Sequence, residues 1–115
     1  MRSALLLAVL ALTTVPAAYG TGTLSFANDK FEIQIVISDV NDEFIQLRLY
    51  GESGLLLSVQ SQQAEIVHYD PAKGRLHLIV PASGSQPRLD LIIRGKNATM
   101  TYGAERVKLK GNWKR

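Results

Sequence analysis

Two histidines have the spacing that points most directly to chemistry. His68 and His77 flank the segment 70–74 (DPAKG), in which proline fixes one φ angle and glycine supplies a positive one. If this segment is a hairpin turn, Asp70 pairs with Arg75 and His68 lies opposite His77. Cross-strand side chains lie about 5 Å apart, so the two imidazoles could share a metal ion. A zinc site needs three or four ligands and the chain has no cysteine, so we expect two surface histidines and no metal.

Other arrangements for catalysis or metal binding are weaker. The acidic segment 39–43 (DVNDE) has the oxygen density of a calcium loop, but it lacks the central glycine and the distal glutamate of an EF-hand. No cysteine nucleophile, Gly-x-Ser-x-Gly motif or glycine-rich phosphate loop occurs. We therefore expect a protein that is not an enzyme and that has no cofactor.

The first residues resemble an export signal. Arg2 is followed by an uncharged run over residues 4–15, and Ala18-Tyr19-Gly20 has the small-x-small pattern of a cleavage site. The apolar run is too short to span a bilayer comfortably. The sequence thus predicts a signal peptide over residues 1–20, cleaved near Gly20, and one β domain over residues 21–115. The expected location is periplasmic or secreted.

Alternation with a period of two dominates the rest of the chain. It is clearest over the runs 31–38, 45–50, 89–94 and 106–110, with breakers such as the Pro/Gly/Ser loop 81–87 between them. About eight short strands at regular spacing predict an all-β protein: an antiparallel rolled sheet, a jelly roll or a β-sandwich. The end of the chain follows soon after a predicted strand, so we expect an open sheet edge there.

Charge is distributed unevenly. Residues 21–87 carry four basic and eight acidic side chains, whereas residues 88–115 carry eight basic and two acidic ones. A basic end on an exported chain favours an anionic partner, such as a phosphorylated lipid or an acidic protein surface. The simpler alternative is that alternating strands place Lys and Arg on their solvated face. The basic stretch holds only Tyr102 and Trp113 as aromatic residues, so we expect no nucleic-acid binding.

One pattern occurs twice, over residues 64–78 and 98–112. Each copy has an alanine, a short run ending in tyrosine, a turn and a second alternating run, and Tyr69 and Tyr102 lie 33 residues apart. Each copy predicts a β-hairpin with one apolar face. Two copies are too few for a solenoid, so we expect consecutive hairpins within one rolled sheet.

The repeated unit resembles that of the OstA-like, LptA-containing family of periplasmic lipopolysaccharide-transport proteins. The resemblance rests on Tyr69-Asp70-Pro71 with Gly74, and on Leu109-Lys110-Gly111-Asn112. The first copy ends Leu78-Ile79-Val80-Pro81, where the family pattern has Gly-Asn. The resemblance implies a rolled "taco" sheet whose apolar trough holds acyl chains, and whose edges join successive molecules.

This leading hypothesis is a non-enzymatic module that binds a lipid or lipopolysaccharide-like amphiphile, or an envelope partner, and can associate with itself edge to edge. Its residues fall into two groups. The candidate trough comprises Phe31, Ile33, Ile35, Ile37, Leu47, Leu49, Leu91, Ile93, Met100, Val107 and Leu109. The candidate anionic-group contacts are Arg94, Lys96, Arg106, Lys108 and Lys110.

Three alternatives remain open. The aliphatic faces could close on each other as an ordinary sandwich core. The protein could be a structural or adhesive β-sandwich that binds a protein or glycan and no lipid. A small metal-dependent enzyme using His68 and His77 is the third function class.

Overall fold

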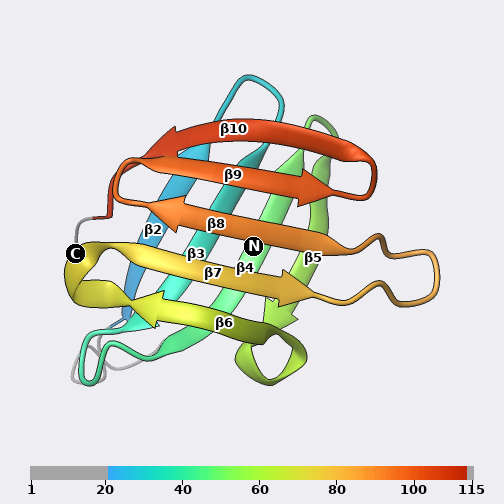
Figure 1. The fold of residues 1–115 in the computed structure, drawn as a ribbon. Helices are drawn as coiled ribbons and strands as arrows, with labels where there is room; N and C mark the ends of the chain where they lie inside the picture. Colours follow the sequence, from blue (N-terminus) through green and yellow to red (C-terminus); the bar gives the residue numbers. More distant parts are fainter. Residues whose placement is uncertain (1–20, 114–115) are drawn as a thin grey trace.

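The fold is known from a computed structural model, which describes residues 21–113, and it is all-β (Figure 1). The predicted signal peptide lies outside the described residues. Short 3₁₀ turns occupy Ser61–Gln63 (η2) and Pro71–Lys73 (η3). No helix in residues 21–113 is long and apolar enough to cross a membrane. The strands are β2 (Thr21–Ala27), β3 (Glu32–Ser38), β4 (Phe44–Gly51), β5 (Gly54–Gln60), β6 (Glu65–Asp70), β7 (Arg75–Val80), β8 (Leu89–Arg94), β9 (Asn97–Tyr102) and β10 (Glu105–Gly111).

These strands form one antiparallel sheet in the order β5-β4-β3-β2-β10-β9-β8-β7-β6. The sheet curls so that its two halves face each other, as the sequence predicted for a rolled sheet. Figure 1 shows β6–β10, the C-layer, running across in front of β2–β5, the N-layer, with the two strand directions crossing steeply. Such orthogonal packing lets the inner faces of a twisted sheet enclose one core.

The two layers are joined where β2 meets β10. This pairing covers only two positions, Lys110 with Ala27 and Gly111 with Phe26. Gly111 is required by the close approach of the chains: a Cβ there would lie 2.1 Å from the Ser25 carbonyl oxygen. The Asn28 side chain adds a hydrogen bond of 3.1 Å to the Lys108 carbonyl. Gly111, within the segment Leu109-Lys110-Gly111-Asn112, therefore lies where the two layers of the roll join.

Among the strands that the structure describes, β5 and β6 form the two edges of the sheet, and both come from the middle of the chain. The open edge expected at the C-terminal end is wrong, because β10 pairs with β9 on one side and with β2 on the other. Both edge strands carry a register shift, near Tyr50 in the β4–β5 pairing and near Val67 in the β6–β7 pairing. Irregularities of this kind increase the local twist of an edge strand.

The core is closed between the layers. The predicted alternation is seen in β3, where Ile33, Ile35 and Ile37 are fully buried and the intervening residues are partly exposed. In β4 the pattern slips by one residue at its start. Phe44 takes the inward position opposite Ile37, and Ile45 is the extra residue of a bulge. Alternation over residues 45–50 puts Ile45 on the same face as Leu47 and Leu49. This is wrong for Ile45, because the sequence pattern carries no signal for the bulge.

The duplicated pattern corresponds to two hairpins, β6–β7 and β9–β10, as predicted. The first turn has Gly74 at φ +66° after Pro71–Lys73, and the Asp70 carboxylate accepts a hydrogen bond from the Lys73 backbone. Both tyrosines are half-buried and hold a loop. The Tyr69 hydroxyl donates to the Asp42 carbonyl, and the Tyr102 hydroxyl accepts from Gln86 at 2.9 Å.

Candidate functional site

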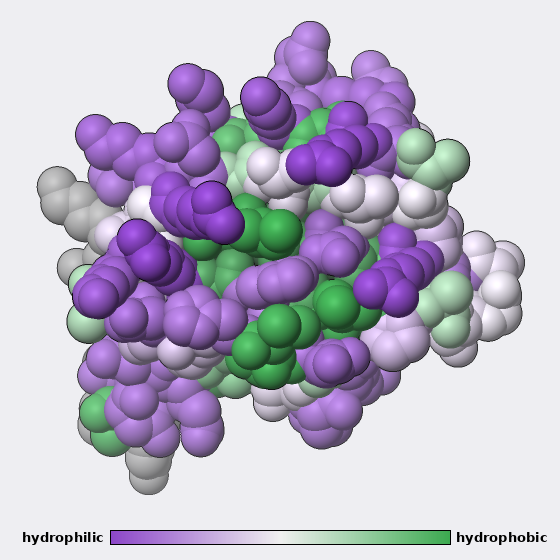
Figure 2. Space-filling view, in the orientation of Figure 1, coloured by the Kyte–Doolittle hydropathy of each residue, from purple (hydrophilic) through white to green (hydrophobic). Residues whose placement is uncertain are grey.

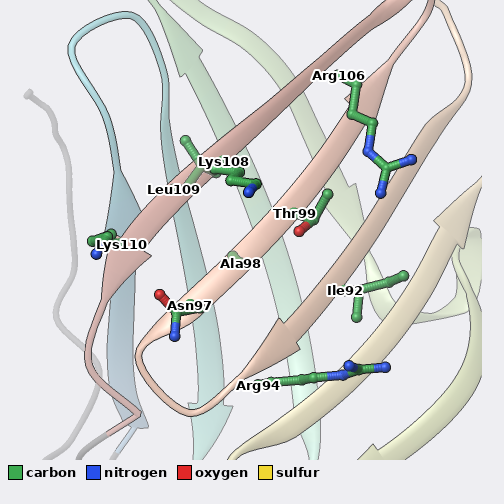
Figure 3. Close-up of a pocket in the computed structure, with 9 residues that line it drawn as sticks. All are labelled: Ile92, Arg94, Asn97, Ala98, Thr99, Arg106, Lys108, Leu109 and Lys110. Atoms are coloured by element: carbon green, nitrogen blue, oxygen red, sulfur yellow. The ribbon is translucent and has the colours of Figure 1, made fainter.

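The outer face of the C-layer carries a shallow depression, the basic hollow, of about 430 Å³. Alternation along β10 places Arg106, Lys108 and Lys110 on this face, and Arg94 reaches it from the end of β8. Four of the five predicted anionic-group contacts thus line one hollow. Figure 3 shows their side chains spread around it, with Lys108 extending from β10 toward β9 and Ile92 between the two arginines in this view. The other lining residues are Asn97, Ala98, Thr99 and Leu109.

The strand pairings explain why these residues come together. Thr99 of β9 lies between Ile92 on β8 and Lys108 on β10, and Asn97 lies between Arg94 and Lys110. The central strand contributes short neutral side chains, while its neighbours contribute long cationic ones. The arrangement leaves space above β9 that is bordered by positive charge and can accept an anionic group.

The two carboxylates on strands β8–β10, which line the hollow, are engaged elsewhere. Asp90 contacts Nε2 of His77 at 2.9 Å and lies 3.9 Å from Arg88, and Glu105 pairs with Lys30 at 2.7 Å. Hydrogen bonding to Glu105 raises the pKa of the exposed Lys30 ammonium. Within residues 21–113, no carboxylate oxygen lies within salt-bridge distance of the four cations of the basic hollow. Their charge is thus available to a ligand.

The same outer face is not uniformly polar. Figure 2, in the orientation of Figure 1, shows apolar surface at its centre with hydrophilic side chains around and across it. On the outer face of the C-layer, Ile79 and Ile92 occupy outward register positions and are half-buried. A face that combines aliphatic surface with surrounding cations suits an anionic amphiphile better than a small inorganic ion.

Lys96 is separated from the other predicted basic contacts. It lies in the β8–β9 turn and lines a different depression of about 400 Å³, together with the turn 71–74, Gly95, Asn112 and Trp113. Strand alternation does not determine where Lys96 points, because a turn has no fixed inward and outward face.

The candidate trough is a closed core. Ten of its eleven residues are buried with exposed fractions of 0–6 %, and Val107 is partly buried against them. The sequence left open whether the aliphatic faces form a trough or a core, and the described residues form the core. Inward side chains of one layer pack on those of the other, so an acyl chain entering this space would have to displace them. The buried members are Phe31, Ile33, Ile35, Ile37, Leu47, Leu49, Leu91, Ile93, Met100 and Leu109.

The two histidines lie as the hairpin argument predicted, with His68 directly opposite His77. Sequence reasoning missed the partner of His77, which is Asp90 on the next strand. Asp90 pairs in register with Ile79, two residues from His77, so only the β7–β8 register could have revealed the contact. The described residues contain no group of three His, Asp or Glu side chains placed to bind a metal ion.

The acidic segment 39–43 forms the turn between β3 and β4. Its side chains stabilise the turn itself: Asn41 accepts a hydrogen bond from the Glu43 backbone at 3.1 Å, and the Ser38 hydroxyl accepts one from Val40 at 3.2 Å. This is the behaviour of short polar residues in turns.

The fold and this face define an all-β protein with a curled antiparallel sheet and a basic outer surface. Comparison of the chain with protein-family models, with curated proteins and with solved structures finds no match.

Proposed function

We propose that this protein is a non-enzymatic, exported module of the OstA-like type that binds an anionic amphiphile of the cell envelope, with a lipopolysaccharide-like lipid as the leading class of ligand. The single observation that carries the proposal is the basic hollow. Four cations converge there on one face, without carboxylate partners among the described residues, beside exposed aliphatic surface.

The proposed binding mode differs from an acyl chain held in an open trough. Because the core side chains fill the interior, the anionic head group would bind in the basic hollow, and the aliphatic part would lie against Ile92 and the adjoining face. Each Lys or Arg near an anionic lipid surface contributes about 1 kcal/mol to binding, so four of them suffice for measurable association.

Lipid that accompanies the purified protein provides the test. The full chain is expressed with export and purified in the absence of detergent, and bound lipid is identified by mass spectrometry. We expect phosphate-bearing lipid with the native chain, and its loss from a Lys108→Gln/Lys110→Gln variant that remains folded. A Ser58→Ala variant, altered on the outer face of the N-layer, serves as the control and should retain the lipid. Absence of lipid from the native chain, together with no binding of added anionic vesicles, would refute the proposal.

A second candidate function, association through sheet edges, is favoured by the exposure of apolar residues on both edge strands. Leu55 and Leu56 of β5 are 56 % and 40 % exposed, and Ile66 and Val67 of β6 are 40 % and 49 % exposed. Exposed apolar edges can pair with a second copy or with an envelope protein. Sedimentation of the native chain and a Leu55→Lys/Val67→Lys variant tests this: self-association should be concentration-dependent and lost in the variant.

A further inference from the structure

A second hollow adjoins the first on the same outer face. It measures about 380 Å³ and is lined by His68, Arg75, His77, Ile92 and Arg94, with Leu76 and Ile93 beneath. Ile92 and Arg94 line both hollows, so the two lie side by side on this face. We name this second depression the arginine hollow.

Two arginines lie directly opposite each other in it. Arg75 on β7 pairs in register with Arg94 on β8, and both side chains are exposed. Like charges directly opposite each other on a sheet repel, and this repulsion disfavours the pairing unless an anion lies between them. Neither arginine has a carboxylate within salt-bridge distance among residues 21–113.

The carboxylates that the strand pairings place nearest to the two arginines have other partners. Asp70 pairs with Arg75 along the backbone, but its carboxylate accepts from the Lys73 amide at 3.3 Å. Asp90 is held by His77 and lies beside Arg88. The arginine pair is therefore left with its donors available on the solvent side.

The geometry points to a specific ligand chemistry, and we propose that Arg75 and Arg94 together bind a phosphate monoester group. Guanidinium groups present planar forks of donors that match the oxygen atoms of phosphate, and two of them can engage one group from both sides. A monoester carries close to two negative charges at neutral pH, whereas a diester carries one, so a pair of arginines favours the monoester. Two histidines facing each other at the same hollow add further nitrogen donors or acceptors.

This inference rests on the proposed function in one respect: it names the chemistry of a phosphate group that a head group bound at the basic hollow would extend into the adjoining arginine hollow. The doubly charged phosphate group could be the monoester of a lipid head group or inorganic phosphate in solution. Binding titrations with inorganic phosphate and with short-chain phosphatidic acid, which share that chemistry, distinguish the two sources.

The diagnostic variant is Arg75→Gln, because Arg75 lines only the arginine hollow. Arg48→Gln is the matched control. Arg48 is a strand residue on the outer face of the other layer, and its substitution removes the same charge. Binding of phosphatidic acid and of inorganic phosphate is measured by calorimetry, with nitrogen-edited NMR of the arginine Nε–H groups. We expect phosphatidic acid to bind, the Arg75 and Arg94 signals to shift, and Arg75→Gln to weaken binding about tenfold, whereas Arg48→Gln has no effect.

If inorganic phosphate binds as tightly as phosphatidic acid, the ligand is free phosphate. The arginine pair would still be its binding site. Equal affinity of Arg75→Gln and native protein for phosphatidic acid would overturn the inference, as would equal affinity for phosphatidic acid and a short-chain phosphatidylglycerol. In either case, continued binding of anionic vesicles that depends on Lys108 would leave the proposed function standing. Loss of vesicle binding as well would refute both the phosphate site and the proposed function.

Discussion

The hydroxyl of Tyr69 donates a hydrogen bond to the backbone carbonyl of Asp42 and so ties the edge strand β6 to the β3–β4 turn of the opposite layer. Tyr69 is half-buried, and its ring packs against Trp113 with centroids 6.3 Å apart. This contact joins the two layers through residues other than those of the β2–β10 pairing. It gives the tyrosine of the first repeated hairpin a structural role.

Removing the hydroxyl should therefore loosen the contact between the layers. We expect Tyr69→Phe to lower the free energy of unfolding by about 1 kcal/mol, since the Asp42 carbonyl loses a donor while the ring packing remains. Urea unfolding measures the difference. Tyr50→Phe, at an outward position of β4, is the control and should leave stability within about 0.5 kcal/mol of native; equal losses in the two variants would contradict the assigned role.

Stability should also fall at alkaline pH. Burial raises the pKa of Tyr69 above its ordinary value of 10.0, and hydrogen bonding to Glu105 raises the pKa of Lys30 above 10.5. Both groups bind their proton more tightly in the folded state, so their contribution is complete below pH 10 and is lost as pH rises through the raised values. Urea unfolding across this range should show a declining free energy and a smaller decline in Tyr69→Phe. An identical slope in the variant would rule out the tyrosine contribution.

Gly111 provides a test of how the roll closes. Adding a methyl group in Gly111→Ala places it against the Ser25 carbonyl and the Phe26 ring, so β10 must move away from β2. We expect a loss of about 1–3 kcal/mol from this overpacking. The neighbouring Asn112→Ala, at an exposed position, should change stability by less than about 0.5 kcal/mol. Thermal and urea unfolding measure both variants, and a native-like Gly111→Ala would show that the pairing is not needed.

If the core is closed, truncating two neighbouring residues of β3 should lower the free energy of unfolding by very different amounts. Ile35 is fully buried, whereas Val36 is on the partly exposed outer face. Ile35→Ala should cost about 2–5 kcal/mol because it leaves a cavity, and Val36→Ala should cost less than about 1 kcal/mol. Chemical unfolding gives both values. Small and similar losses would indicate that the inner face is open to solvent, as in a trough.

Much of this fold could be predicted from the sequence because its signals are local. Alternation identifies the strands, and the turn residues of segment 70–74 set the register that brings His68 opposite His77. The basic hollow was predictable in part, since Arg106, Lys108 and Lys110 share one face of a single strand. What could not be predicted depends on contacts between distant segments. The bulge at Ile45, the pairing of β2 with β10 and the contact of His77 with Asp90 have no local signal.

Two further features could not be predicted from alternation within strands: the closing of the candidate trough into a core, and the separation of Lys96 from the other cations. Alternation shows which residues share a face, but only the curl of the sheet shows that two such faces close on each other. Likewise, the position of Lys96 in a turn separates it from cations that are close to it in the sequence. The sequence pattern was thus informative within strands and uninformative between layers and in turns.

One affinity measurement decides whether the basic outer face binds anionic amphiphiles. Binding to phosphatidylcholine vesicles containing phosphatidylglycerol is measured for the native chain, for Lys108→Glu and for the matched reversal Arg48→Glu on the other layer. At about 1 kcal/mol for each charge near the lipid surface, reversal at Lys108 should weaken binding more than tenfold, while reversal at Arg48 should have a much smaller effect. Equal affinities for all three proteins, or no binding by the native chain, would contradict the claim.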